Sequence, residues 1–189
     1  TGILNDPFVN STAAEKYATI MYTLGEYIRL LLVPHPLTHD YYPFQVPIMN
    51  WGDWQVWLAF VINAAIVFWA VKAWKKRSVP TWSIFYYYAT LSIDSNIVFS
   101  VGAPMNERFV FVSSLGFCLL MVYLLIDRLP ALLEQYEWAG KLGLGLLVLI
   151  ALGYGWKTFD RVPAWQDKFT LNQEAIKVST NSARANSFM

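Results

Sequence analysis

Charged residues are scarce in this chain of 189 residues: 14% are Asp, Glu, Lys or Arg, against about 25% in an average soluble domain. The formal net charge is only +1, so nothing in the composition favours a nucleic-acid partner. The single cysteine, Cys118, excludes a disulfide within the chain, and its place in an apolar run predicts an inert core residue. Hydrophobic residues make up 56% of the chain and aromatic residues 17%.

Several apolar runs approach the roughly 20 residues that a helix needs to cross a bilayer. They cover residues 54–74, 82–101, 109–126 and 142–156. The nine Trp and eleven Tyr cluster near the ends of these runs, where amphipathic rings favour the headgroup layer. We therefore predict an all-α polytopic membrane protein with about four transmembrane helices.

A further helix is predicted at residues 15–33, but it carries charge at its centre. Glu26 and Arg29 stand three positions apart and can pair on one helix face. Two central charges disfavour a free membrane span. We expect this helix to lie in the membrane interface, to be re-entrant, or to pack against the bundle, while a buried span remains an alternative.

A proline-rich loop follows, over residues 34–53, and its four prolines exclude a regular helix. The loop holds a group of titratable and aromatic side chains: His35, His39, Asp40, Tyr41 and Tyr42. They form either a binding surface or a structural loop whose tyrosines anchor at the headgroups. Histidine and aspartate are metal ligands, yet their spacing fits no strong zinc pattern, so no metal ligand is assigned.

A basic cluster closes the 54–74 run and orients the chain: Lys72, Lys75, Lys76 and Arg77. Basic residues stay in the cytoplasm, so this end is predicted to be inside. The division that follows has three parts. Residues 1–53 form an outer loop, an interfacial helix and the proline-rich loop, residues 54–156 form a four-helix transmembrane segment, and residues 157–189 form an extracytoplasmic linker.

Glu107 and Arg108 stand side by side at the junction between two apolar runs, within the stretch GAPMNERFVFVSSLGFC. Charges this close to hydrocarbon are unfavourable unless they pair, face water or hold a ligand. They either contact a ligand or pair with each other or with neighbours and stabilise the turn. Asp94 lies within the 82–101 run. It is either functional, or it bonds the facing helices or lies near the outer surface.

From Trp165 onward the chain becomes polar with spaced apolar residues. Asp167 or Thr170 is predicted to cap a helix that runs through Lys177. One such helix cannot bury its own apolar face, so we expect the start of a helical repeat array or a short surface helix. The polar ends of the chain lead us to expect a piece of a larger protein.

Residues 95–120, SNIVFSVGAPMNERFVFVSSLGFCLL, resemble the signature of the transmembrane and tetratricopeptide-repeat O-mannosyltransferase family. Asn5-Asp6-Pro7 and LLLVPHPLTHDYYP at residues 30–43 are similar to two loops of that family, and the tail resembles its tryptophan-led linker into the first tetratricopeptide repeat. The tyrosine pair after Asp40 and the short, charge-poor loops look closer to bacterial relatives.

The resemblance implies a GT-C-type glycosyltransferase that transfers a sugar from polyprenyl phosphate to Ser or Thr of exported proteins. The chain would be the C-terminal part of the membrane domain, with the catalytic acid outside it, so no catalytic residue is assigned here. Its partners would be the lipid bilayer, the lipid-linked sugar and the acceptor protein, with a divalent metal as a further option. The location would be a bacterial inner membrane, or the endoplasmic reticulum in a eukaryote.

Within such an enzyme the chain would supply a cation for the departing phosphate and an apolar groove for the lipid. Arg108 is the predicted phosphate contact, with Glu107 orienting it or capping the next helix, and Arg29 is the second candidate. His39, Asp40 and Tyr41 would line the sugar or acceptor side. The competing class is a non-enzymatic membrane anchor for an external repeat array; a transporter or flippase is disfavoured, because no paired broken helices are predicted.

Overall fold

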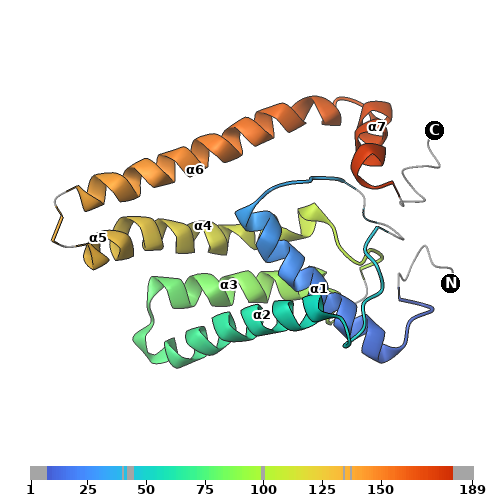
Figure 1. The fold of residues 1–189 in the computed structure, drawn as a ribbon, viewed down its shortest axis with the longest axis horizontal. Coiled ribbons are helices and arrows are strands. Elements are labelled where there is room, and N and C mark those ends of the chain that lie inside the picture. Colours follow the sequence, from blue (N-terminus) through green and yellow to red (C-terminus); the bar gives the residue numbers. More distant parts are fainter. Residues whose placement is uncertain are drawn as a thin grey trace.

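The computed structural model describes residues 8–39, 41, 45–98, 101–133, 135–136 and 138–180. These residues form helices and loops, with no β-strand among them, which confirms the all-α class. Helices α2, α3, α4 and α6 run lengthwise, α1 crosses them at an angle, and α7 lies at one end (Figure 1).

Helix α1, Ala13–Leu32, begins with a reciprocal cap. The Thr12 hydroxyl accepts a hydrogen bond from the Glu15 N–H at 3.3 Å, and the Glu15 carboxylate accepts one from the Thr12 N–H at 2.7 Å. The predicted pair of Glu26 and Arg29 is confirmed at 2.7 Å. The helix packs closely on α2, because a Cβ added at Gly25 would meet the Ala59 Cβ at 2.7 Å. Its position relative to the membrane interface stays a prediction.

Helix α2, Trp54–Lys72, matches the first predicted span, whereas α3, Val79–Asp94, is shorter than expected. Its 16 residues rise about 24 Å, less than the roughly 30 Å of a hydrocarbon core. The prediction of a span over residues 82–101 is therefore wrong at its C-terminal end. The physical reason is Asn96, whose φ of 60° is left-handed and cannot continue a right-handed helix.

Helix α4, Ser114–Val122, continues through a π-helical stretch, Tyr123–Arg128, into α5, Leu129–Leu132. The prediction that this helix starts at 109 and ends at 126 is wrong at both ends, since a 3₁₀ turn, Glu107–Val110, precedes it. Cys118 is exposed, contrary to the predicted core position. Gly116 faces α3. Cys118 lies two residues further along the helix and therefore points about 200° away from Gly116, on the side opposite α3.

Helix α6, Ala139–Arg161, extends beyond the predicted 142–156 at both ends. A 3₁₀ turn, Val162–Trp165, leads to α7, Lys168–Val178. Asp167 caps α7 by accepting the Thr170 N–H at 2.8 Å, which confirms the predicted tail helix.

Helix α6 contacts the bundle at two separated points. Near its start, the backbone at Gly143 lies against the Leu125 carbonyl oxygen so closely that a Cβ would collide with it. Further along, the Tyr154 hydroxyl donates a hydrogen bond to the Leu31 carbonyl oxygen at the end of α1. Most of the helix surface between and beyond these points is exposed.

Three helical stretches are long and apolar enough to cross a membrane: Trp54–Lys72, Ser114–Leu132 and Ala139–Trp165. Only 22%, 6% and 6% of their most apolar windows are buried, so their side chains need hydrocarbon or other protein around them. These helices are those of an integral membrane protein. The expected fourth span, α3, falls short of this length.

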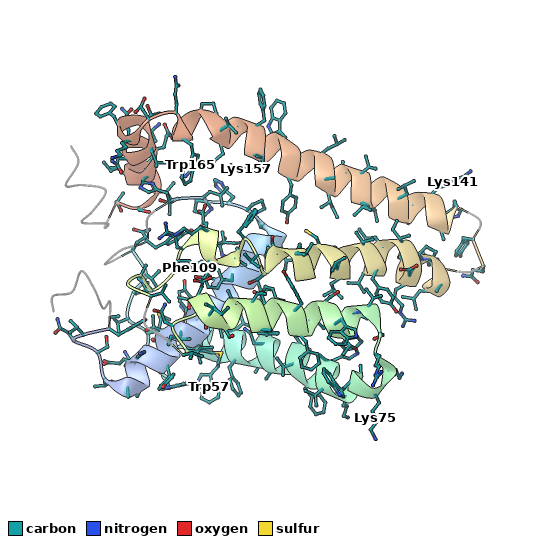
Figure 2. All side chains as sticks on the ribbon, turned by 180° about the vertical axis from the view of Figure 1, so that it is seen from behind. Trp57, Lys75, Phe109, Lys141, Lys157 and Trp165 are labelled. Carbon is teal, nitrogen blue, oxygen red and sulfur yellow. The ribbon has the colours of Figure 1, made fainter. Side chains whose placement is uncertain are left out.

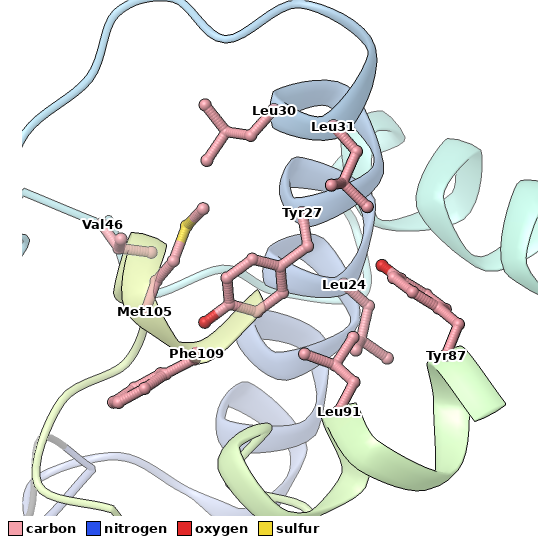
Figure 3. Close-up of a cluster of buried hydrophobic side chains, with 9 residues drawn as sticks. All are labelled: Leu24, Tyr27, Leu30, Leu31, Val46, Tyr87, Leu91, Met105 and Phe109. Atoms are coloured by element: carbon pink, nitrogen blue, oxygen red, sulfur yellow. The ribbon is translucent and has the colours of Figure 1, made fainter. Parts of the chain in front are cut away.

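A cluster of buried apolar side chains joins α1 to α3 and to the loop before α4 (Figure 3). Leu24, Tyr27, Leu30 and Leu31 come from α1, and they pack against the following partners: Val46, Tyr87, Leu91, Met105 and Phe109. Burying one such side chain stabilises the fold by roughly 1.5–3 kcal/mol where the alternative is water. The cluster therefore holds the proline-rich loop and the Glu107–Val110 turn at the same end of the molecule.

The labelled residues of the connecting segments lie at two opposite ends of the helix bundle (Figure 2). Lys75 and Lys141 lie at one end, while Phe109, Lys157 and Trp165 lie at the other. The basic cluster and the Glu107 turn are thus separated by the length of the helices, as the predicted alternation requires. The assignment of either end to the cytoplasm stays a prediction.

Candidate functional site

Glu107 connects its 3₁₀ turn to the proline-rich loop. Its Oε1 atom accepts hydrogen bonds from the Thr38 N–H and from the Tyr41 hydroxyl, the latter at 3.2 Å. Burial raises the pKa of the Glu107 carboxyl, and the two donors and the positive charge of Arg161 oppose this rise. The pKa of Tyr41 is also raised, first by burial and then by the charge of Glu107. Glu107 therefore joins two segments that lie far apart in the sequence.

Asn106, not Glu107, caps the turn that follows. Its Oδ1 accepts the Arg108 N–H at 3.1 Å, and its Nδ2 donates to the His39 carbonyl oxygen at 3.2 Å. The Asn106 N–H donates to the Tyr27 hydroxyl at 3.2 Å. The sequence prediction missed this residue, although an Asn just before an apolar helical run is a recognised cap signal.

The two arginines predicted to contact phosphate differ in their surroundings. Arg29 bonds to Glu26 and donates to the His35 carbonyl oxygen at 2.8 Å. Arg108 is exposed, with its guanidinium carbon 5.6 Å from the centre of the Phe109 ring. Within the described ranges no ion pair joins Glu107 to Arg108, so pairing with each other gains no support. The other half of that alternative, in which they pair with neighbours, agrees with the bonds of Glu107 to Thr38 and Tyr41.

The remaining predicted site residues are only partly brought together. The His39 ring lies edge-on to Trp165, with ring centres 6.4 Å apart, and Tyr41 bonds to Glu107. Asp94 is the last residue of α3, so it lies at a helix end and not inside a span. Asp40 lies outside the described residues.

No group of three His, Cys, Asp or Glu side chains that could hold a metal ion occurs in the part of the chain that the structure describes. The combination of His35, His39 and Asp40 stays untested, because Asp40 is not among those residues.

Helix α7 is attached to the proline-rich loop by two hydrogen bonds. The Ser179 hydroxyl donates to the Thr38 hydroxyl at 2.9 Å, and the Gln45 side-chain amide donates to the Val178 carbonyl oxygen at 3.2 Å. The start of the C-terminal region is therefore part of the same end of the molecule as Glu107.

Three adjoining hollows lie between the C-terminal half of α6 and residues 34–37, with volumes of about 450, 210 and 410 Å³. We call them together the α6 cleft. Lys157 lines all three, Arg161 lines two, and Leu149 lies at the apolar end. The sequence analysis did not single out Lys157 and Arg161 as site residues, although their spacing of four residues beyond an apolar run places both on one helix face.

The chain is similar to two mammalian proteins named as O-mannosyl-transferases. Human protein O-mannosyl-transferase TMTC1 is 24% identical over 180 residues, which are 89% of this chain and 20% of the human protein. Human TMTC3 is 31% identical over 91 residues, 48% of this chain and 9% of that protein. Mouse TMTC1 is 26% identical over 178 residues, 89% of this chain and 18% of the mouse protein.

This similarity covers a fifth or less of each relative's length. It agrees with the family resemblance carried by residues 95–120. The relatives are human and mouse proteins, so they lend no support to the expected closeness to bacterial members. No protein-family profile and no solved structure matches the chain.

Proposed function

We propose that this chain is the membrane-embedded, C-terminal part of a protein O-glycosyltransferase that takes its sugar from a polyprenyl-phosphate donor. The supporting facts are its similarity to proteins named O-mannosyl-transferases and its three apolar helices. In this proposal the acceptor is a Ser or Thr hydroxyl of an exported protein. The membrane is a bacterial inner membrane or the endoplasmic reticulum, and the GT-C-type catalytic acid comes from chain outside these 189 residues.

The observation that supports this function most is the convergence of polar groups at one end of the apolar helices. Glu107, the loop that carries His39 and Tyr41, and the polar end of the α6 cleft all lie there. An enzyme that joins a membrane lipid to a water-soluble acceptor needs its reacting groups at such a boundary.

The reaction itself is a substitution at the anomeric carbon of the sugar. The acceptor hydroxyl oxygen forms a bond to that carbon, and the bond from the carbon to the phosphate oxygen breaks with its electron pair leaving on the phosphate. The hydroxyl proton passes to the carboxylate outside this chain. The contribution of this chain is a cation near the leaving phosphate, with Arg108 as first candidate and Arg29 as second.

The other predicted residues take supporting places in the same proposal. Glu107 holds the proline-rich loop against the turn that carries Arg108. We propose that His39, Asp40 and Tyr41 contribute to binding the sugar or the acceptor. Asp94, the last residue of α3, is proposed to lie at the same boundary. A divalent metal would assist the phosphate if the complete protein binds one.

The C-terminal region is proposed to lie outside the cytoplasm and to lead into tetratricopeptide-like repeats, with α7 as their first helix. The attachment of α7 to the proline-rich loop also favours the second candidate function, a membrane anchor for an external repeat scaffold. The two functions are separated by whether the full-length protein transfers a sugar at all.

The test of the glycosyltransferase proposal replaces Arg108 with Lys, Gln and Ala in the full-length protein and measures sugar transfer at varied donor concentration. Gln and Ala should raise the donor KM by roughly ten- to a hundred-fold, the loss expected for one hydrogen bond to a charged group. Lys should rescue only part of it, because it lacks the planar fork of guanidinium. Arg77→Gln, at the opposite end, is the matched control. Unchanged donor dependence in all three variants removes the role of Arg108, and a full-length protein without transfer activity leaves the anchor.

A further inference from the structure

The α6 cleft changes from apolar to cationic along the helix. Leu149, Ile150 and Gly153 line its first hollow. Lys157 and Arg161 line the second, and no acidic side chain is among the described residues that line it. At 1.5 Å per residue, Leu149 and Lys157 are separated by about 12 Å along the helix axis. The cleft therefore has the polarity profile of an amphiphile whose head lies at the boundary and whose chain runs toward hydrocarbon.

The apolar end is open down to the helix backbone. A Cβ added at Gly153 would meet no other atom within 4 Å, so a chain can lie directly against α6 there. The hollow at this end has a volume of about 450 Å³ and is bounded on the other side by Pro34 and His35. It offers an open apolar surface along the helix, against which a hydrocarbon chain can lie.

The cationic end lacks a full set of counter-charges. Lys157 and Arg161 form no ion pair within the described residues, and the Arg161 Nη2 atom is buried there without a hydrogen-bond partner. Asp160 and Glu174 line the last hollow beside these cations, and Glu174 is paired with Lys177 at 2.5 Å. The Asp160 carboxylate is the acidic group that remains there, so the site for an anion is the second hollow, which neither acid lines. Glu107 acts on Arg161 only through its charge. A buried guanidinium donor without an acceptor is unfavourable, so an anion in the cleft would stabilise it.

We infer that the α6 cleft binds the phosphate of a single-chain membrane lipid, with Lys157 and Arg161 on the phosphate and the chain along Leu149 and Gly153. Two cations one helical turn apart can contact different oxygens of one phosphate, and the guanidinium fork can contact two. The choice of a single-chain lipid, the polyprenyl-phosphate donor, rests on the proposed function and would put its phosphate on Lys157 and Arg161 in place of Arg108 and Arg29. Binding of a lipid phosphate in the α6 cleft does not itself rest on that function.

The experiment measures lipid binding to the full-length protein by native mass spectrometry, with sugar-free polyprenyl phosphate as the probe. Phosphatidylglycerol and inorganic phosphate are the comparison ligands. The double variant Lys157→Gln/Arg161→Gln should weaken polyprenyl phosphate binding by roughly ten- to a hundred-fold, as expected for lost charge-assisted bonds. Lys75→Gln/Lys141→Gln is the control, since it removes the same charge from the opposite end (Figure 2).

A second pair of variants tests the apolar end. Gly153→Leu fills the hollow and should weaken binding of polyprenyl phosphate but not of inorganic phosphate. Gly145→Leu is its control, because a Cβ there also meets nothing within 4 Å. Both replacements remove a helix glycine, so neither should harm folding.

Equal binding by the wild type and the double variant overturns the inference, even if the protein transfers sugar. Tighter binding of phosphatidylglycerol than of polyprenyl phosphate, or binding of inorganic phosphate as tight as that of the lipid, overturns it too. Charge-dependent binding of polyprenyl phosphate supports it even in a protein without transfer activity.

Discussion

Ser179 and Thr38 share a hydrogen bond of 2.9 Å between two hydroxyl groups that are both 0% exposed, although 141 residues separate them in the sequence. Because both hydroxyl groups are buried, water cannot take the place of either hydrogen-bonding partner if the other is removed. The residue that follows α7 is thereby joined to the loop whose backbone N–H bonds to Glu107.

Replacing Ser179 with Ala should loosen α7 from the proline-rich loop. The change leaves the Thr38 hydroxyl short of one buried partner, at a cost of about 1–3 kcal/mol. Hydrogen exchange in residues 168–178 should accelerate while that in α2 stays unchanged. Ser92→Ala is the matched control, because its exposed hydroxyl bonds only within its own helix. Equal protection of α7 in both variants would show that the bond does not hold it.

Glu107→Gln should change how stability depends on pH. Burial raises the folded-state pKa of Glu107 above its ordinary 4.5. Its contribution is therefore complete below that pH and is lost as the pH rises through the folded pKa. Gln keeps an acceptor for Thr38 and Tyr41 without a charge. The unfolding midpoint of the wild type should therefore fall relative to that of the variant as the pH rises from below 4.5.

The contrasting variant for that experiment is Glu15→Gln. The pKa of Glu15 is lowered by its bonds to the Thr12 backbone and side chain, so its contribution is present above the ordinary pKa and lost in acid. The relative stability of this variant should therefore move with pH in the opposite direction. Parallel curves for the two variants would contradict the assignment of Glu107 as a buried carboxyl.

Gly116→Ala should separate α4 from α3. A Cβ at Gly116 would lie 2.5 Å from the Ser83 carbonyl oxygen and 3.1 Å from the Tyr87 nitrogen, and backbone atoms cannot move aside without shifting a helix. We expect a loss of about 1–3 kcal/mol in the free energy of unfolding. Gly155→Ala, with open space at its Cβ, should be neutral or stabilising. The prediction fails if the two variants unfold together in a denaturant titration.

Substitutions of Asn96, in the loop after α3, should destabilise the protein. Its Oδ1 accepts the Val101 N–H and its Nδ2 donates to the Ala103 carbonyl oxygen, both at 2.9 Å. Its φ of 60° also suits Asn and Gly better than other residues. Asn96→Ala should destabilise the protein more than Asn96→Gly, as measured by thermal unfolding, because Ala loses both the bonds and the backbone preference. Equal midpoints would argue against the backbone contribution.

The sequence predicted those parts of the fold that depend on local pattern. Apolar runs and terminal tryptophans located α2 and α6, and the Asp167 cap located α7, because helix length and capping are short-range properties. The end of α3 was missed, since hydropathy continues past Asp94 while the helix stops at the left-handed Asn96. An apolar run reports where hydrocarbon is tolerated, not where the backbone turns.

The sequence identified some of the residues of the candidate site, but not which residues they contact. Glu107 was identified from its charge beside hydrocarbon, yet its hydrogen bonds go to the proline-rich loop and not to the adjacent Arg108. Lys157 and Arg161 gave no sign in the sequence of facing a cleft, because the cleft forms between α6 and residues 34–37. Contacts between segments more than a hundred residues apart depend on packing that no local pattern encodes.

The two attachment points of α6 govern how a ligand can enter beside it. The Gly143 backbone rests on Leu125, and the Tyr154 hydroxyl is bonded to Leu31. Because α6 is attached to the bundle at two points along its length, it resists tilting. Widening the α6 cleft would require either the Gly143–Leu125 contact or the Tyr154–Leu31 hydrogen bond to break. A ligand that reaches Lys157 is therefore expected to enter the α6 cleft through its open first hollow, without a tilt of the helix.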